Sequence, residues 1–218
     1  MDLEEFLHSF DQFTITDIEV QKKDNNRISV FLNHHFAFGL SIETYEKYPL
    51  KVNETINHEM IDDLLLFEKE VQAGTNALKF LGIKARTELE VRKKLKTLQY
   101  GSDIIDKIIE NLKSKKILDD LDFTEMMVRD FVKFKKEGVF KLIRNLKQKG
   151  ISAEIIEEVL EKYISPEEQL EKALYLGQKK YDFLGEKENK KEKIYRFLMQ
   201  KGFKKSIVIE ALGKIFKG

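Results

Sequence analysis

The stretch "LKQKGISAEIIEEVL", Leu146–Leu160, decides the fold because the chain contains three versions of it. "LKTLQYGSDIIDKII" begins at Leu95 and "LMQKGFKKSIVIEAL" begins at Leu198, which are shifts of 51 and 52 residues. Apolar residues recur at six equivalent positions, two of which lie upstream of the quoted stretches. The equivalent sets are Leu95, Leu146, Leu198; Tyr100, Ile151, Phe203; Ile104, Ile155, Ile207; Ile109, Leu160, Leu212; Val91, Leu142, Ile194; and Phe80, Phe131, Phe183. Such a period indicates tandem duplication of one structural unit.

Each unit is predicted to contain three helices. In the second unit the first helix is expected over Asp122–Lys136, and Gly138 separates it from a second helix over Val139–Lys149. Gly150 is expected to end that helix in a left-handed conformation, and Ser152 to cap the third helix. Helices of about a dozen residues need neighbours to be stable. Three units of three helices therefore predict an elongated helical array.

The first seventy residues have a different pattern. "TITDIEVQKK" and "RISVFLN" are rich in β-branched residues and flank "DNN", which predicts two or three antiparallel strands between Thr14 and Leu40. Short helices are expected from Ile42 and from His58, the latter running directly into the first repeat. The fold class is thus mainly α, with tandem three-helix repeats preceded by a small antiparallel β-hairpin or sheet. The predicted domains are 1–68 (strand-bearing extension), 69–118, 119–164 and 165–218 (three-helix repeats).

Composition excludes several classes of protein. The chain has no cysteine, which rules out disulfides, thiolate metal sites and cysteine nucleophiles. Its apolar runs are too short to cross a membrane, and its acidic first residues do not resemble a secretory signal, so we expect a cytoplasmic protein. Residues 1–70 hold six Lys/Arg and fifteen Asp/Glu, a balance of −9, whereas residues 71–218 carry +10. This asymmetry indicates a polyanion or acidic protein as the partner of the repeats, unless the lysines only solvate their helices.

The second helix of each repeat is predicted to turn cations toward solvent. On a helical wheel, Lys93, Arg144 and Arg196 take the same outward position in the three repeats. Lys96 and Lys147 form a second row in two of them. The same wheel also places outward Glu90 and Thr97, Lys141 and Gln148, and Lys193 and Gln200. The hypothesis is a basic track along the repeats, and the alternative is an ordinary solvated face.

The third helices argue against a helix-turn-helix reader of DNA. The second repeat offers Glu154, Glu157, Glu158 and Glu161 where such a reader needs positive charge. The first repeat likewise has acids at these positions, namely Asp103, Asp106 and Glu110. Only the third repeat, with Lys204, Lys205 and Lys214, keeps DNA reading open.

No constellation for catalysis is found. The chain has no phosphate-binding loop or dinucleotide fingerprint, and Asp62 stands where a zinc-protease motif beginning at His58 needs a second histidine. His34 and His35 would point to opposite faces of a strand, so they could not easily bind one metal ion together. Asp119, Asp120 and Asp122 suit either a magnesium site or helix capping. Phe36 or Phe38, if exposed, could contact a partner protein. We expect a binding protein that is not an enzyme and has no cofactor or metal.

Four segments in order resemble the RecX family, whose members regulate the RecA recombinase. They are "KARTELEVRKKL" from Lys84, "ILDDLDFTEMMVRDF" from Ile117, "GVFKLIRNLKQKGIS" from Gly138 and "QKGFKKSIVIEAL" from Gln200. The N-terminal "ITDIEVQKKDNNRISVFLNHHFAFGL" resembles the strand-bearing extension of many members. The sequence departs from the family pattern at Ile117, Met127, Thr97 and Gln99.

The resemblance implies a monomer that docks in the groove of the RecA–single-stranded DNA filament. There it would modulate, mostly inhibit, ATP turnover, strand exchange and co-protease activity in the SOS response, and it would have affinity for single-stranded and double-stranded DNA. The candidate contacts to RecA or DNA are Arg92, Lys93, Lys94, Lys96, Lys141, Arg144, Lys147, Lys149, Lys193, Arg196, Lys201, Lys204 and Lys205. The alternatives are a stand-alone helical DNA-binding regulator and a helical adaptor for another partner.

Overall fold

An antiparallel sheet opens the structure, a computed structural model that describes residues 11–216. Its strand order is β3-β2-β1-β4, with each neighbouring pair antiparallel. The strands are β1 (Gln12–Gln21), β2 (Asp24–Leu32), β3 (His35–Ser41) and β4 (Thr55–Asn57). The prediction of two or three antiparallel strands between Thr14 and Leu40 is therefore confirmed, and the number is three. The sequence analysis missed β4, which has only three residues and pairs with the start of β1.

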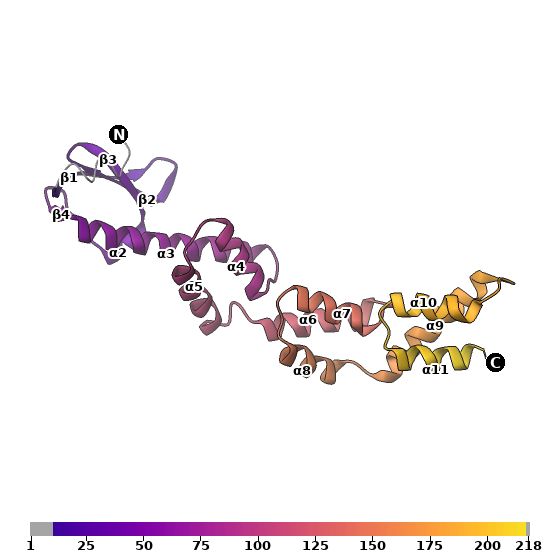
Figure 1. Ribbon diagram of the computed structural model, residues 1–218. Coiled ribbons are helices and arrows are strands. Elements are labelled where there is room, and N and C mark those ends of the chain that lie inside the picture. Colours follow the sequence, from indigo (N-terminus) through magenta and orange to yellow (C-terminus); the bar gives the residue numbers. More distant parts are fainter. Residues whose placement is uncertain (1–10, 217–218) are drawn as a thin grey trace. The chain divides into compact units, whose positions relative to one another are not determined.

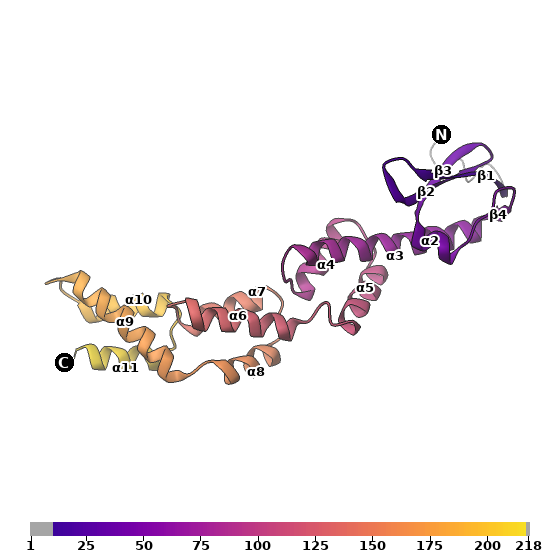
Figure 2. The ribbon, with the colours of Figure 1, turned by 180° about the vertical axis from the view of Figure 1, so that it is seen from behind.

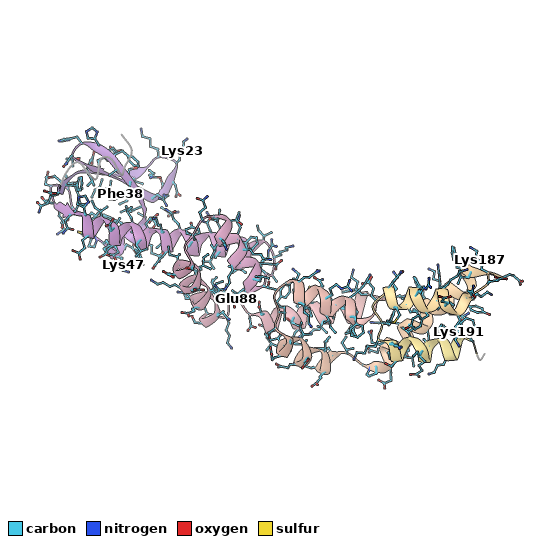
Figure 3. All side chains as sticks on the ribbon, in the orientation of Figure 1. Lys23, Phe38, Lys47, Glu88, Lys187 and Lys191 are labelled. Carbon is cyan, nitrogen blue, oxygen red and sulfur yellow. The ribbon has the colours of Figure 1, made fainter. Side chains whose placement is uncertain are left out.

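Helices α2 (Ile42–Lys47) and α3 (His58–Ile83) begin at the two predicted residues. Side chains of the sheet, including Phe13 and Leu40, form one buried core with Ile61 and Leu64 of α3. Figure 3 shows Phe38 on the side of the sheet that faces the helices, where it is buried. Phe36, in contrast, is 59 % exposed. Because α3 has 26 residues, it runs from the sheet into the first repeat, as predicted.

A buried carboxylate joins the sheet to α3. Glu68 accepts hydrogen bonds from the Ser41 amide and hydroxyl, from Thr44 Oγ1 and from Gln72 Nε2. It also pairs with Arg27, whose Nη1 lies 3.0 Å from Glu68 Oε1. Burial by itself would raise the pKa of Glu68, but the donated hydrogen bonds outweigh it, so the pKa lies below its ordinary value of 4.5.

Nine helices, α3 to α11, follow one another in three groups within the described residues, as predicted (Figure 1). After α3 they are α4 (Glu88–Thr97), α5 (Ser102–Ser114), α6 (Asp120–Phe134), α7 (Val139–Gln148), α8 (Ala153–Tyr163), α9 (Pro166–Leu184), α10 (Lys190–Gln200) and α11 (Lys205–Ile215). Ser152 caps α8 by accepting from the Ile155 amide, and Gly150 has a φ of 85°, both as predicted. A mainly α fold with three-helix repeats is thus confirmed.

Equivalent apolar positions of the repeats are buried or half-buried, with Phe183 as the exception. Leu95, Leu146 and Leu198 are all inaccessible to solvent. Phe183, which the period equates with the buried Phe131, is instead 73 % exposed, and its neighbour Leu184 is buried. The first helix of the third repeat has 19 residues against 15 in the second, so the spacing of the motif does not carry over to its end.

The described residues fall into two compact units. One contains residues 11–84 with Arg92–Asn111, and the other contains Ala85–Val91 with residues 112–216. Within the second unit, Figures 1 and 2 both show α9, α10 and α11 side by side. The predicted domain boundaries at 68, 118 and 164 stay predictions.

Backbone hydrogen bonds connect the second and third repeats. The Gly138 amide donates to the Lys201 carbonyl, and the Phe140 amide donates to the Gly202 carbonyl, each at 2.9 Å. Both amides belong to the start of α7, where a helix cannot pair its own N–H groups. The turn between α10 and α11 supplies the carbonyls, and Gly202 takes a φ of 88° there. A Cβ on Gly138 would lie 2.0 Å from the Gly202 carbonyl carbon.

We expect the substitution Gly138→Ala to destabilise the second unit. Its methyl group cannot occupy the space held by the backbone of Gly202 and Phe203, so the two repeats must separate at this point. The expected loss in the free energy of unfolding is about 3 kcal/mol or more, measured by urea denaturation. Gly213→Ala is the matched control, because a Cβ there meets nothing within 4 Å. Equal stability of the two variants would contradict the packing described.

The Glu68 carboxylate should make the stability of the first unit depend on pH. Because its pKa is lower in the folded state, its contribution is present above about pH 4.5 and is lost as the pH falls through the folded-state pKa. Glu68→Gln should lower the free energy of unfolding at neutral pH by about 1–3 kcal/mol and flatten this acid dependence. Urea denaturation of both proteins at several pH values measures this. The exposed Glu46→Gln should retain the parental profile.

Candidate cationic interface

The middle helices α4, α7 and α10 carry most of the predicted contact residues. Lys93, Arg144 and Arg196 are all exposed, as the helical wheel predicts. Within residues 11–216, Lys93 and Arg144 form no ion pair, whereas Arg196 pairs with Glu192 one turn earlier. The exposed Lys96 and Lys147 are likewise without a carboxylate partner in this range. Lys93, Lys96, Arg144 and Lys147 can therefore meet an external anion without first breaking an internal ion pair.

Other members of the predicted set are engaged inside the protein. Arg92 pairs with Asp106, and Lys141 pairs with Glu137 at 2.8 Å. Lys193 Nζ donates to the Glu188 carbonyl at 2.9 Å. Lys94 and Lys201 are half-buried, and Lys201 Nζ lies 5.7 Å from the centroid of the Phe197 ring. The structure thus separates this set into free and engaged cations, and the role of each as a contact stays a prediction.

Lys149 lies at a junction between repeats. Its Nζ is 2.8 Å from Glu90 Oε1, and its backbone carbonyl accepts a hydrogen bond of 2.7 Å from Thr87 Oγ1. Thr87 is buried and precedes α4, just as Gly138 precedes α7. Gly150, the next residue, packs so closely on Leu89 that a Cβ would lie 2.6 Å from the Leu89 Cβ. This contact between the first and second repeats is therefore the counterpart of the contact between the second and third repeats.

Glu90 is not directed outward, contrary to the prediction from the wheel. Its carboxylate is half-buried between Lys149, Arg86 and the Thr87 amide. Burial would raise the pKa of Glu90, but the hydrogen bond from Lys149 and that from the Thr87 amide, with the charge of Lys149, hold it below its ordinary value. The wheel considers one helix alone, and Lys149 comes from 59 residues further along the chain.

The starts of the third helices differ in charge. Asp103 lies in the first turn of α5, and Glu154 in that of α8, where acids suit the positive end of the helix dipole. The first turn of α11 has no acid, and Lys204 and Lys205 are exposed there. Lys187 and Lys191 extend the cationic surface at the junction of α9 and α10 (Figure 3). The basic character of the third repeat is thus carried mainly by exposed side chains.

Asp119 and Asp120, two of the three acids that suit either capping or magnesium, accept hydrogen bonds at helix starts. Asp119 accepts from the Leu121 and Asp122 amides at the start of α6, and Asp120 accepts from the Glu88 amide. Burial raises the pKa of Asp120, and the nearby Glu88 charge raises it further, although the Glu88 amide opposes both. Residues 11–216 contain no group of three side chains placed to hold a metal ion. Among the helices in that range, none combines the length and apolarity required to cross a membrane.

Sequence reasoning missed a group of side chains on α6 and α9. Lys133, Lys135 and Lys136 are exposed at the end of α6, next to the exposed rings of Phe134 and Tyr175. The run "FVKFKK" at Phe131–Lys136 was available as a signal for the lysines. Tyr175, however, is 41 residues away from Phe134, so only the fold brings the two rings to one region.

Comparisons with known proteins match the whole pattern of elements. The model of the "Regulatory protein RecX N-terminal domain" matches residues 13–57. Models of the first, second and third three-helix domains of RecX match residues 75–112, 119–160 and 167–212. "Regulatory protein RecX" of Clostridium botulinum (strain Eklund 17B / Type B) is 37 % identical over 198 residues, covering 89 % of this chain and 92 % of that protein. That of Clostridium beijerinckii is 35 % identical over 205 residues, covering 92 % and 95 %.

Solved structures agree with these matches. The crystal structure of RecX from Lactobacillus salivarius has a TM-score of 0.64 and 28 % identity, covering 69 % of this chain and 98 % of that one. A second structure, "Crystal structure of regulatory protein RecX", has a TM-score of 0.76 and covers 94 % of this chain and 100 % of that one. At 24 % identity, the second likeness supports the fold alone.

We expect Thr87→Val to weaken the junction at Lys149. Valine keeps the shape of the side chain but leaves the Lys149 carbonyl without its 2.7 Å hydrogen bond. The expected loss in the free energy of unfolding is about 1–3 kcal/mol, and Thr87→Ser should restore part of it. Thr97→Val is the matched control, because the exposed Thr97 hydroxyl bonds only within its own helix, to the Lys93 carbonyl. Urea denaturation that gives Thr87→Val the stability of Thr97→Val would refute the role of this contact.

Proposed function

The chain belongs to the RecX family of regulatory proteins, and from this premise we propose that it binds the RecA–single-stranded DNA filament. Docked in the groove of the filament, it modulates, and mostly inhibits, RecA ATPase, strand exchange and co-protease activity. The observation that carries the proposal is the match of all four family domains in order along the chain. The protein acts by binding and not by catalysis.

The distribution of charge supports a polyanionic partner. Residues 71–218 carry a balance of +10, and Lys93 and Arg144 lie exposed at equivalent positions of two repeats. Cations that are not already neutralised gain the full benefit of pairing with phosphates or acidic side chains. Lys149 and Arg92 are the weakest candidates of the proposed set, because carboxylates of other helices already pair with them.

Repetition of the contacts explains how weak contacts can regulate a filament. Each exposed cation contributes little on its own, since surface ion pairs are worth about 0–1 kcal/mol. Once one repeat is bound, however, the next meets its own site at a high effective concentration. The backbone contacts of Gly138 and Phe140 hold the second and third repeats together, so both reach the filament as one body. Such a body hinders the subunit motions that ATP turnover requires.

A stand-alone DNA-binding regulator is the alternative, favoured by one observation. Lys204 and Lys205 are exposed at the start of α11, where the helix dipole and unpaired amides also attract phosphate. Duplex binding with sequence preference in the absence of RecA would favour this alternative over the filament. We further propose that the protein is cytoplasmic and monomeric, and that the four domains divide at 68, 118 and 164.

Charge reversal at the equivalent outward positions tests the proposed interface. The triple variant Lys93→Glu, Arg144→Glu, Arg196→Glu should bind RecA filaments at least about tenfold more weakly and inhibit their ATPase less, because each contact becomes a repulsion. The three side chains are exposed, so the far-UV circular dichroism and urea midpoint should stay close to the parent. Filament binding and ATPase are measured at several salt concentrations.

Three exposed lysines of the sheet region supply the control. Lys22→Glu, Lys23→Glu, Lys51→Glu changes the net charge by the same amount outside the repeats. This control should retain filament binding if position matters and not charge alone. Unchanged inhibition by the repeat variant would discredit these positions, and no effect of the parent protein on RecA at stoichiometric excess would discredit the function itself.

A further inference from the structure

The end of α6 carries a concentration of cations that no internal acid neutralises. Lys133, Lys135 and Lys136 are exposed, and none of them forms an ion pair within residues 11–216. Some other cations outside the proposed interface are paired, including Lys107 with Glu70 and Lys162 with Glu125. Three unpaired ammonium groups within four residues repel one another, so an external anion is favourable there.

Aromatic rings lie among these lysines. Phe134 is 65 % exposed and Tyr175, from α9, is 50 % exposed. Lys136 Nζ lies 3.9 Å from the centroid of the Tyr175 ring, and Lys133 Nζ lies 5.1 Å from that of Phe134. Each ring is thus held beside an ammonium group by a cation–π contact. Exposed aromatic rings have an energetic cost in water, which binding of another flat apolar surface removes.

A cleft between α6 and α9 collects these groups. Its volume is about 290 Å³, and Phe134, Lys136, Glu171 and Tyr175 are among its lining residues. Lys172 also lines the cleft and donates to the Val132 carbonyl at 2.8 Å. A second cleft, of about 580 Å³, lies along α9 and α11, and Tyr175 lines both. The first cleft is therefore lined mainly by lysines and aromatic rings, and Glu171 is the acid among its lining residues.

We propose that this α6–α9 patch (Lys133, Phe134, Lys135, Lys136, Tyr175) binds single-stranded nucleic acid. Unpaired bases stack on the rings of Phe134 and Tyr175, while the three lysines pair with the phosphates of the same strand. A base that takes the face of a ring displaces the ammonium group, which then lies next to the backbone. Duplex DNA fits less well, because its bases are stacked on each other and expose no face.

An acidic protein surface is the competing partner for the lysines. It would use the charges but gain little from two exposed rings beside them, and for this reason the nucleic acid is favoured. The proposal rests on the proposed function only in its ligand, since the RecA filament contains single-stranded DNA. It assigns that ligand to a surface separate from the middle helices, and it holds in the absence of RecA.

Fluorescence anisotropy with a labelled oligothymidylate of about 16 nucleotides, without RecA, tests the patch. Phe134→Ala should weaken binding about tenfold, because one stacking contact is lost, whereas Phe134→Trp should retain it. Phe36→Ala is the matched control: this ring is similarly exposed, at 59 %, but lies in the acidic part of the chain. Lys133→Gln, Lys135→Gln, Lys136→Gln should reduce the slope of log affinity against log salt by about 2, and Lys22→Gln, Lys23→Gln, Lys51→Gln should not.

Several outcomes would overturn the proposal. They are no binding of the oligonucleotide by the parent protein at low salt, equal affinity of the Phe134→Ala and Phe36→Ala variants, and an unchanged salt slope in the α6 lysine variant. If the α6 lysine variant loses binding to polyglutamate but keeps binding to the oligonucleotide, the patch binds an acidic protein instead. RecA ATPase, measured in parallel, separates the two proposals: a parent protein that binds the oligonucleotide through the patch but leaves RecA unaffected disproves only the proposed function.

Discussion

The second unit depends on one kind of contact, in which the start of a middle helix packs against a turn of the next repeat. A helix leaves its first amides unpaired, and burial of such groups without a partner is costly. Here the amides of Gly138 and Phe140 find the carbonyls of the Lys201–Gly202 turn, so the same bonds that satisfy α7 also fix its neighbour. The first junction achieves this with a side chain, because Thr87 donates its hydroxyl to the Lys149 carbonyl.

This packing also determines which cations are available to a partner. Lys149 is near a junction and pairs with Glu90 across it, so it contributes to the assembly of repeats. Arg144 and Lys147 are on the same helix but away from the junction, and they remain exposed. Neighbouring cations of one repeat thus need not have the same role. A charge count treats all three side chains alike, and only their neighbours distinguish structure from interface.

Local sequence was sufficient for the helices and the three longer strands, but it missed the three-residue β4 and the contacts between elements. Ser152, Gly150 and the starts at Ile42 and His58 follow from caps, turns and periodicity, which act over a few residues. The helical wheel also predicted correctly that Lys93, Arg144 and Arg196 are exposed. Glu90 was misplaced because its partner comes from another repeat, and the α6–α9 patch was missed because Tyr175 joins it only through folding. The period aligned the exposed Phe183 with the buried Phe131, because it could not show that α9 is four residues longer than α6.

The third repeat shows how stability and function can be separated. Cations at a helix start oppose the helix dipole and typically cost about 0.3–1 kcal/mol each. The first and second repeats avoid this cost with Asp103 and Glu154, whereas α11 begins with Lys204 and Lys205 and no acid in its first turn. Folding alone gives no reason for this choice of charge. An anionic partner does, because phosphate at that helix start gains from the lysines, the dipole and the unpaired amides together.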